Sequence, residues 1–327
     1  MTRPLAGVVL VFALAPPLVA AEVERGTTQF ACPTDATAGV PERYRLPACS
    51  FDFTLAPRLT LRHSGVNVFD LTFPSPVKSG VAANDTVYGE YFVPAGKGKF
   101  PAVIVLDIMD GAGVVSRGQA MWLAQNGVAA LVVHMPYYGP RRQPGSKLRL
   151  MSTDLSRTVE GVRQLVLDCR CATAWLASRP EVDADKLGLV GTSLGSLMGA
   201  NVAAAEPRLK TVCLLLTGGD LYDAYASHPL AKPYLTILGA IGGTAAIKKA
   251  IAPVDPITHG PALKGKNLLI VAASRDDVVP PRAAEALWAA SGKQKIVWLD
   301  ATHVGAALFV FPLMKEVVNH LKGSGNP

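Results

Sequence analysis

The sequence predicts an α/β protein: a mostly parallel, twisted sheet with helices on both faces and a lid-like insertion. Two observations support this prediction. From residue 100 onward, short apolar runs typical of buried strands alternate with longer segments of helical apolar spacing. In addition, Lys186–Gly199 (KLGLVGTSLGSLMG) is typical of a buried strand, a sharp turn and a helix in direct succession. Such alternation builds a parallel sheet in which helices form the crossovers.

Composition and charge describe a large globular chain. Half of the 327 residues are hydrophobic and 17% are charged, which supports a sizeable core and argues against disorder. The formal net charge is +7, but the basic residues are dispersed and no basic run is interleaved with aromatic residues. We therefore expect no nucleic-acid partner.

Residues 1–21 have the features of a secretory signal peptide. Arg3 supplies a positive start, Leu5–Leu14 an apolar core, and Val19–Ala21 a small-residue cleavage site. We expect a secreted or periplasmic protein with no stable membrane span after cleavage, because the apolar run is short for a span. An uncleaved anchor is the alternative.

Export permits disulfides among the cysteines. The pair we expect is Cys32–Cys49, which would staple an N-terminal segment that is poor in periodic structure. Cys213 lies in a strand-like run and is interpreted as a buried apolar residue. Cys169 and Cys171 face apart on a predicted helix, and without a nearby histidine they are weak evidence for a metal site.

The N-terminal elements are justified in chain order. Residues 22–64 are rich in Pro, Thr and Ala without clear periodicity, and we expect an extension wrapped on the main domain, 65–327. Apolar residues alternate over 69–73, and 87–93 is a second strand; both suit an antiparallel edge. The run 100–106 is continuously apolar, as a buried strand should be.

The later elements continue the alternation. Further strands are expected at 128–133, 211–216, 268–273 and 295–299. Helices are expected at 115–125, 154–177, from the turn at residue 193 to 205, 282–290 and 304–321. Residues 221–266 break the rhythm, and we interpret them as an insertion over the site, a lid, with an ordinary crossover helix as the alternative.

Gly191-Thr192-Ser193-Leu194-Gly195 fits the G-x-S-x-G pattern of a nucleophile elbow. The serine occupies a strained strand-to-helix turn, and the two glycines let the backbone pass close by. The Leu194 N–H then points from a helix N-terminus toward an anion formed beside the serine. A chance match is the alternative, but the flanking strand and helix favour a nucleophile.

A nucleophilic serine needs a base, and the base needs a carboxylate. In a parallel sheet these groups belong on loops beyond the carboxyl ends of strands. Asp276 and Asp277 follow the strand 268–273, and His303 follows the strand 295–299.

With these residues the chain resembles the α/β-hydrolase superfamily, in its dienelactone-hydrolase-like, serine esterase branch. The resemblance covers about 66–322 and rests on three motifs in the order Ser, Asp, His: the elbow, the small-x-x-Asp-x-x-Val-Pro segment Ala273–Pro280, and His303. The Asp255-Pro256 pair is also similar to members of that branch.

The resemblance implies the α/β-hydrolase fold and a role for each motif residue. Ser193 is expected as the nucleophile, His303 as the general base and acid, and Asp276 as the orienting carboxylate. Asp277 is the alternative carboxylate. His134, which ends a strand, is the rival base, although a structural hydrogen-bonding role is more common at such a position.

The resemblance also places an oxyanion-hole donor in the loop after 100–106. By position the Met109 N–H would join that of Leu194, with Ile108 as the alternative donor. Asp107 and Asp110 in this loop could mimic a metal pair, but no histidine is near, so no metal is expected.

The loop after 128–133 resembles a Pro-Tyr-Tyr-Gly-x-Arg segment of some α/β-hydrolases. Tyr137 and Tyr138 are candidates to line a substrate pocket, and Arg141 to meet a substrate carboxylate or phosphate. The alternative is a rigid loop whose tyrosine hydroxyls bond to the backbone.

Taken together, the resemblance implies a secreted serine hydrolase that cleaves small-molecule carboxylic esters through an acyl-enzyme, without a cofactor. A peptidase or acyltransferase of the same fold, and a non-catalytic hydrolase-fold binding protein, are the alternatives. The sequence carries no signal for an oligomeric state.

Overall fold

The structure is a computed structural model that describes residues 22–31, 39–61, 63–110, 112–152, 154–226 and 232–323. Within them one ten-stranded sheet has the order β1-β2-β3-β4-β6-β5-β7-β8-β9-β10. The strands are β1 (Glu24–Phe30), β2 (Cys49–Leu61), β3 (Val66–Pro74), β4 (Thr86–Pro94), β5 (Phe100–Leu106), β6 (Ala129–Val133), β7 (Val182–Thr192), β8 (Leu209–Leu215), β9 (Asn267–Ala273) and β10 (Lys295–Leu299).

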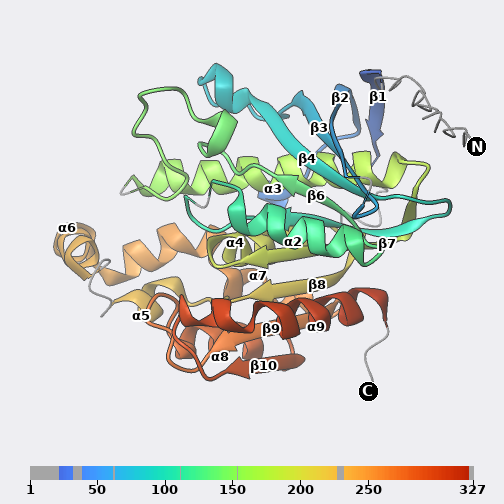
Figure 1. Cartoon of the computed structure of the whole chain (residues 1–327). Coiled ribbons are helices and arrows are strands. Elements are labelled where there is room, and N and C mark those ends of the chain that lie inside the picture. Colours follow the sequence, from blue (N-terminus) through green and yellow to red (C-terminus); the bar gives the residue numbers. More distant parts are fainter. Residues whose placement is uncertain are drawn as a thin grey trace, which may run out of the picture.

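Helices cover both faces of this sheet (Figure 1). They are α2 (Val114–Gln125), α3 (Leu155–Ser178), α4 (Leu194–Ala205), α5 (Leu221–Tyr225), α6 (Lys232–Ile251), α7 (Pro256–Leu263), α8 (Pro281–Ala290) and α9 (Val310–Lys322). Short 3-10 helices lie at Glu42–Tyr44, Ala82–Asp85, Gly139–Arg141, Ala252–Val254 and Gly305–Phe309.

The sheet has a parallel and an antiparallel part. Strands β6, β5, β7, β8, β9 and β10 run parallel, whereas β1 to β4 pair antiparallel and join through β4 to β6. Side chains of α3, α4 and α7 share one apolar core with one face, and those of α2 and α9 share another core with the opposite face. The predicted α/β-hydrolase architecture is therefore confirmed.

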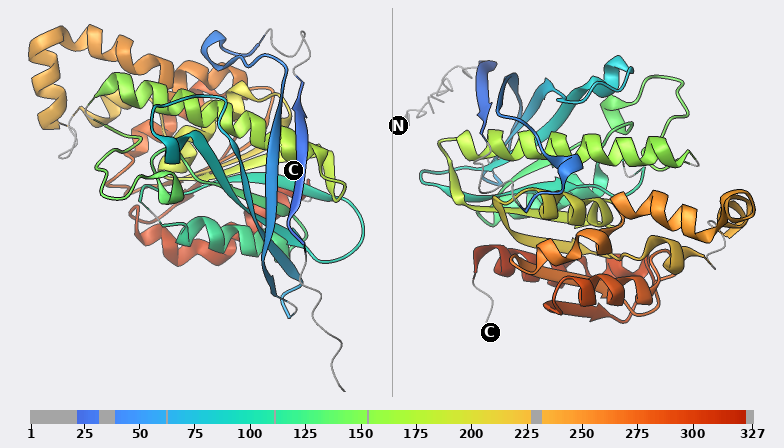
Figure 2. Two further views of the ribbon diagram at one scale, coloured as in Figure 1. Left: turned by 90° about the horizontal axis from the view of Figure 1, so that it is seen from above. Right: turned by 180° about the vertical axis from the view of Figure 1, so that it is seen from behind.

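The N-terminal segment differs from the prediction. The sequence predicts no periodic structure over residues 22–64, but β1 and β2 extend the sheet at one edge (Figure 2). In β2 the side chains of Phe51, Phe53 and Leu55 are buried in alternation, and Phe53 packs on Trp175 of α3 with ring centroids 5.9 Å apart. The extension therefore completes the core over α3.

Two N-terminal predictions fall outside the part of the chain that the structure describes. The predicted signal peptide, residues 1–21, is one, and Cys32, the expected disulfide partner of Cys49, is the other. Both stay predictions. Across the described ranges, no helix is both long and apolar enough to cross a membrane.

The expected insertion, 221–266, divides into two parts. The α5 and α6 part projects at one end of the molecule (Figures 1 and 2). Helix α7 instead belongs to the body, because Leu263 is fully buried in the main core. Asp255 joins the parts: its carboxylate accepts hydrogen bonds from the N–H groups of Leu221 (2.7 Å) and Ile257 (3.2 Å), near the starts of α5 and α7.

Candidate active site

Ser193 lies between β7 and α4 in a conformation that side-chain-bearing residues rarely adopt, with φ 52° and ψ −119°. Its N–H is held by the carbonyl of Leu215 on the neighbouring strand, at 2.9 Å. The two motif glycines explain how the turn fits. A Cβ on Gly191 would collide with the backbone of Gly195, and a Cβ on Gly195 would collide with the carbonyl oxygen of Leu106. The strained turn requires both glycines.

The structure brings Ser193, His303 and Asp276 into one chain of hydrogen bonds. His303 Nε2 lies 2.9 Å from Ser193 Oγ. On the other side of the ring, Nδ1 lies 2.9 Å and 2.8 Å from the two carboxylate oxygens of Asp276. The three residues come from loops after β7, β10 and β9, as the parallel topology predicts.

The surroundings of Asp276 fix its orientation. Its Oδ1 accepts hydrogen bonds from the N–H groups of Val278 at 2.9 Å and Val279 at 2.7 Å. An ionised carboxylate that accepts from these groups accepts from His303 as well, so the imidazole proton sits on Nδ1. His303 Nε2 can then accept the Ser193 hydroxyl proton. Asp277 is exposed, and His303 meets Asp276 instead.

Helix α5 packs on the loop that carries the acid. Ala224 shares a small apolar cluster with Val279, and Arg282 donates a hydrogen bond to the Ala224 carbonyl at 2.7 Å. Burial, and then the charge of Asp276, raise the pKa of Tyr225. The start of the 221–266 segment, which the sequence predicts to be an insertion over the site, therefore lies beside the acid.

The loop after β5 packs directly on the elbow. A Cβ at Gly195 would lie only 2.5 Å from the carbonyl oxygen of Asp107. The Asp107 carboxylate accepts hydrogen bonds from the N–H groups of Gly113 (2.8 Å) and Ser116 (3.2 Å), so it holds the loop to the start of α2. Asp110 lies 3.4 Å from Arg149. These two acids thus have structural partners.

One predicted oxyanion-hole donor lies on the elbow, and the other lies on the loop after β5 that packs against it. Leu194 is the first residue of α4, where a helix leaves its N–H groups without intrahelical acceptors. Met109 and Ile108 follow Asp107 in the loop, and the choice between them stays a prediction.

The substrate-binding prediction for Arg141 is wrong. Its side chain is fully buried and forms an ion pair with Asp168 at 2.8 Å. The guanidinium also donates to the carbonyls of His134 (3.1 Å) and Asn84 (2.7 Å), so it organises the loop from inside. Because the side chain has no exposed surface and its two terminal nitrogens already hold the loop and Asp168, it does not face a ligand.

Tyr137 and Tyr138 are both 8% exposed, and their substrate-binding role stays a prediction. The Tyr137 N–H donates to Asn84 Oδ1 at 3.0 Å. Tyr138 lines a cavity of about 350 Å³ beside the loop that follows β5, together with Ile108. Burial raises the pKa of Tyr138 to about 12.

His134 faces Glu90, whereas the serine hydroxyl is bonded to His303. The Nε2 of His134 lies 3.1 Å from Glu90 Oε1. Arg117 binds both oxygens of Glu90, at 2.7 Å and 2.6 Å, and Arg58 lies 2.7 Å from the same carboxylate. Burial would raise the pKa of Glu90, but the hydrogen bonds from His134 and Arg117 outweigh it and lower the pKa to about 2. His134 therefore belongs to a structural ion-pair cluster.

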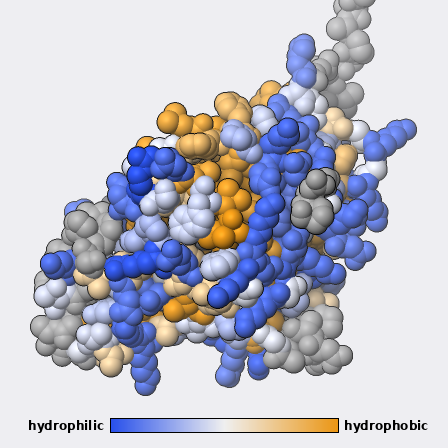
Figure 3. Space-filling model, turned by 90° about the horizontal axis from the view of Figure 1, so that it is seen from below, coloured by the Kyte–Doolittle hydropathy of each residue, from blue (hydrophilic) through white to orange (hydrophobic). Residues whose placement is uncertain are grey.

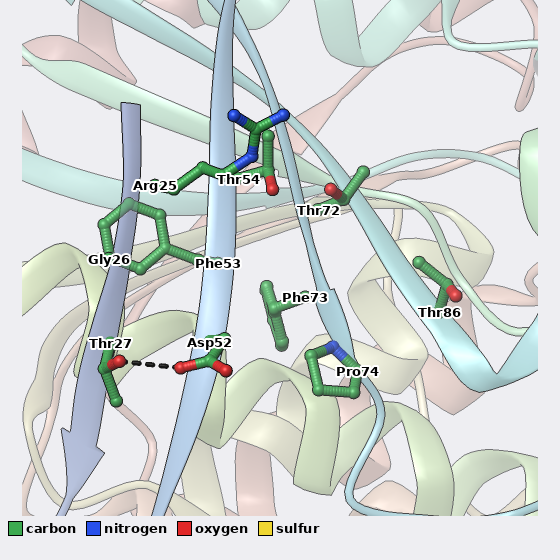
Figure 4. A pocket seen from close by; sticks show the side chains of 10 residues that line it. All are labelled: Arg25, Gly26, Thr27, Asp52, Phe53, Thr54, Thr72, Phe73, Pro74 and Thr86. Atoms are coloured by element: carbon green, nitrogen blue, oxygen red, sulfur yellow. Dashed lines mark hydrogen bonds between the residues drawn. The ribbon is translucent and has the colours of Figure 1, made fainter. Parts of the chain in front are cut away.

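A separate cavity of about 560 Å³ is lined by residues of β1 to β4 (Figure 4). None of the predicted site residues lines it, and the one hydrogen bond drawn there joins Thr27 to Asp52 at 2.6 Å. Among the residues that the structure describes, no group of three or more His, Cys, Asp or Glu side chains is placed to hold a metal ion.

Part of the chain is similar to known sequences. Residues 88–231 match the model of the dienelactone hydrolase family. Uncharacterised proteins of two Mycobacterium tuberculosis strains, CDC 1551 / Oshkosh and ATCC 25618 / H37Rv, are each 28% identical over 207 residues, which is 63% of this chain. The chain also spans 63% of the length of each of these relatives.

Several solved structures share the fold. An acetyl xylan esterase from Paenibacillus sp. R4 has a TM-score of 0.64 at 17% identity, with 81% of this chain and 87% of that chain covered. Acetyl xylan esterase 1 from Thermoanaerobacterium has a TM-score of 0.61 at 19% identity and the same coverage. An esterase from Pyrococcus furiosus has a TM-score of 0.57 at 16% identity, with 81% and 96% covered. The chain therefore has the α/β-hydrolase fold, and residues 88–231 are similar to the dienelactone hydrolase family.

Proposed function

We propose that this protein is a serine hydrolase that cleaves carboxylic esters through an acyl-enzyme. The observation that carries the proposal is the 2.9 Å contact between Ser193 Oγ and His303 Nε2, with Asp276 on the opposite ring nitrogen. The esterase names of the structural neighbours support the choice of an ester as substrate.

The proposed reaction follows from the hydrogen-bond chain that joins Ser193, His303 and Asp276. Ser193 Oγ attacks the ester carbonyl carbon while His303 Nε2 takes the hydroxyl proton. The Leu194 N–H and a donor of the loop after β5 stabilise the oxyanion of the tetrahedral intermediate. His303 then protonates the leaving alcohol, which leaves the acyl group on Ser193. Water next attacks the acyl carbonyl carbon while His303 takes its proton, and His303 returns that proton to Ser193 Oγ as the acid is released. Asp276 keeps the ring oriented and stabilises the imidazolium.

We further propose that the chain is exported and cleaved after Ala21. N-terminal sequencing of the protein recovered from outside the cytoplasm should then begin at Glu22. A product that still begins with residues 1–21 would contradict cleavage.

The test of the enzymatic proposal is hydrolysis of p-nitrophenyl acetate by the wild type and by Ser193→Ala. We expect the substitution to lower kcat by about 10⁴-fold or more, since the nucleophile is lost. Ser178→Ala is a matched control, because the Ser178 hydroxyl donates to the Trp175 carbonyl at 2.7 Å at the end of α3, before the start of β7, whereas Ser193 follows the end of that strand. It should keep the wild-type rate. Labelling of the wild type, but not of Ser193→Ala, by a fluorophosphonate would agree; equal hydrolysis by both would reject the proposal.

A further inference from the structure

The loop that carries Asp276, residues 274–280 (the acid loop), reaches the surface of the molecule. Val278 in this loop is 41% exposed, and hydrophobic side chains gather on the face seen from below in Figure 3, where α8 and α9 lie. Asp276 itself is 8% exposed, and its carboxylate faces His303. A loop at the surface holds a carboxylate in a fixed orientation only where the body of the protein supports it.

The turn between β8 and α5, residues 216–220, lies against the acid loop. Two residues of this turn have a Cβ and a positive φ, Leu216 at 53° and Asp220 at 54°. Such a backbone conformation is unfavourable for residues other than glycine, and it persists only where surrounding contacts impose it. The turn therefore depends on contacts from neighbouring segments.

One set of these contacts joins the turn to the acid loop and α8. A Cβ on Gly218 would lie 3.0 Å from Val279 Cγ1 and 2.6 Å from Ala283 Cβ. The Gly219 N–H donates to the carbonyl of Ala283 at 2.9 Å. Val279 in turn donates its N–H to Asp276 Oδ1 at 2.7 Å. The turn therefore packs on a residue that orients the acid.

Asp255, the residue before α7, holds the same turn. Its Oδ1 accepts the Asp220 N–H at 2.9 Å, and its Oδ2 accepts the Leu221 N–H at 2.7 Å. A Cβ on Gly219 would lie 2.6 Å from Ile257 Cγ2 and 3.4 Å from Asp255 Oδ1, so the turn also packs closely on the start of α7. Asp255 is buried. The turn is therefore held between this carboxylate and the acid loop.

We propose that Asp255 is a positioning residue for Asp276. Its carboxylate fixes the turn 216–220, and the turn packs on Val279. The Val279 N–H then keeps the Asp276 carboxylate in line with His303. A carboxylate that moves out of line no longer orients the imidazole. This inference rests on the proposed function, because it takes Asp276 as the acid of the triad.

The alternative is that Asp255 only caps α7. Its Oδ1 also accepts the Ile257 N–H at 3.2 Å, which is the bond that an N-cap residue makes. Serine caps helices as well as aspartate does, but it offers one short hydroxyl in place of two carboxylate oxygens. Asp255→Ser therefore keeps the cap on α7 and loses the hold on Asp220 and Leu221, whereas Asp255→Ala loses both.

The test combines steady-state hydrolysis of p-nitrophenyl acetate, urea unfolding and the proton NMR signal of the His303 Nδ1–H group, assigned by its absence in His303→Gln. We expect Asp255→Ser and Asp255→Ala to lower kcat by about tenfold or more, because a misplaced acid slows the chemical step. KM should stay unchanged, since Asp276 orients the base and does not touch the ester. Both variants should shift or broaden the His303 signal, which reports the hydrogen bond to Asp276. Only Asp255→Ala should clearly lower the urea midpoint.

Gln294→Ala is the matched control, because the Gln294 side chain also joins backbone groups of α7, β9 and the end of α8. It accepts from the Leu268 N–H at 3.2 Å and donates to the carbonyls of Leu263 at 2.9 Å and Ser291 at 3.1 Å. These bonds lie at the amino end of β9, whereas Asp276 follows its carboxyl end. The control should lower the urea midpoint and keep both kcat and the His303 signal.

A wild-type kcat and His303 signal in Asp255→Ser would overturn the proposal and leave Asp255 as a helix cap. An equal loss of kcat in Gln294→Ala and Asp255→Ser would overturn it too, because destabilisation alone would then account for both. The NMR signal does not require hydrolysis. Failure of the esterase proposal, which equal rates in the wild type and Ser193→Ala would show, is therefore distinguishable from failure of this inference.

Discussion

Replacing Gly195 by alanine tests how the elbow and the loop after β5 fit together. The added Cβ would lie 2.5 Å from the Asp107 carbonyl oxygen and 2.6 Å from the Leu106 carbonyl carbon, and it would also collide with the Leu106 carbonyl oxygen. All three atoms belong to the backbone, so no side chain can rotate away. The two segments must separate, and overpacking of this kind costs about 1–3 kcal/mol.

The separation acts directly on the proposed oxyanion hole, because its two donors lie on the segments that are forced apart. A displacement near 1 Å costs on the order of 10²-fold in rate. We therefore expect Gly195→Ala to lower kcat for p-nitrophenyl acetate by about 10²-fold and to lower the free energy of unfolding in a urea titration by about 1–3 kcal/mol.

Gly118→Ala is the matched control. A Cβ on this α2 glycine would meet nothing within 4 Å, and α2 is helical at this point. The substitution should raise the free energy of unfolding by roughly 0.5–1 kcal/mol, because alanine is the better helix former, and leave kcat unchanged. The reasoning is refuted if Gly195→Ala matches the wild type in both rate and stability.

Three further outcomes are expected. Asp276→Asn should keep the fold, checked by circular dichroism, and lower kcat by about 10⁴-fold, because an amide does not hold the required imidazole tautomer; retention of a tenth of the rate would contradict its role. The pKa of Glu90 is lowered from 4.5 to about 2, so its stabilisation of roughly 3 kcal/mol is present above pH 4.5 and lost as the pH falls toward 2. Urea titrations over that range should show a steeper loss of stability for the wild type than for Glu90→Gln. Arg141→Met should cost about 3–5 kcal/mol by leaving Asp168 unpaired, with KM unchanged in steady-state kinetics; a raised KM at unchanged stability would restore Arg141 to the substrate.

The parts of the site that the sequence predicted are those with local or topological signals. Gly191 and Gly195 are required by close backbone packing within one turn, so the elbow has a readable pattern. Asp276 and His303 are distant in sequence, but each follows a buried strand of a parallel sheet, and such strand ends meet at one edge.

Arg141 shows where this reasoning fails. A polar loop at a strand end is equally suited to a ligand and to a buried ion pair. What decides between them is Asp168, which lies on the next helix and has no motif that links it to the loop. The same holds for His134, whose partner Glu90 comes from an earlier strand.

The missed strand β2 is a different case, because its signal was present. Phe51, Phe53 and Leu55 alternate with Asp52 and Thr54, which is the period of a half-buried strand. The surrounding Pro and Thr residues masked that short alternation. Strand β1 offers less, since its buried residues, Thr28 and Phe30, lie only at its end.

The position of β10 has a consequence for inactivation. Among the strands that the structure describes, β10 is the last of the sheet and pairs only with β9, while β7, which leads into Ser193, lies between β5 and β8. Edge elements open at lower free energy than a buried centre. Local unfolding of β10 would move the His303 imidazole away from Ser193, whose turn stays folded. On heating, we therefore expect hydrolytic activity to be lost before most of the fold unfolds.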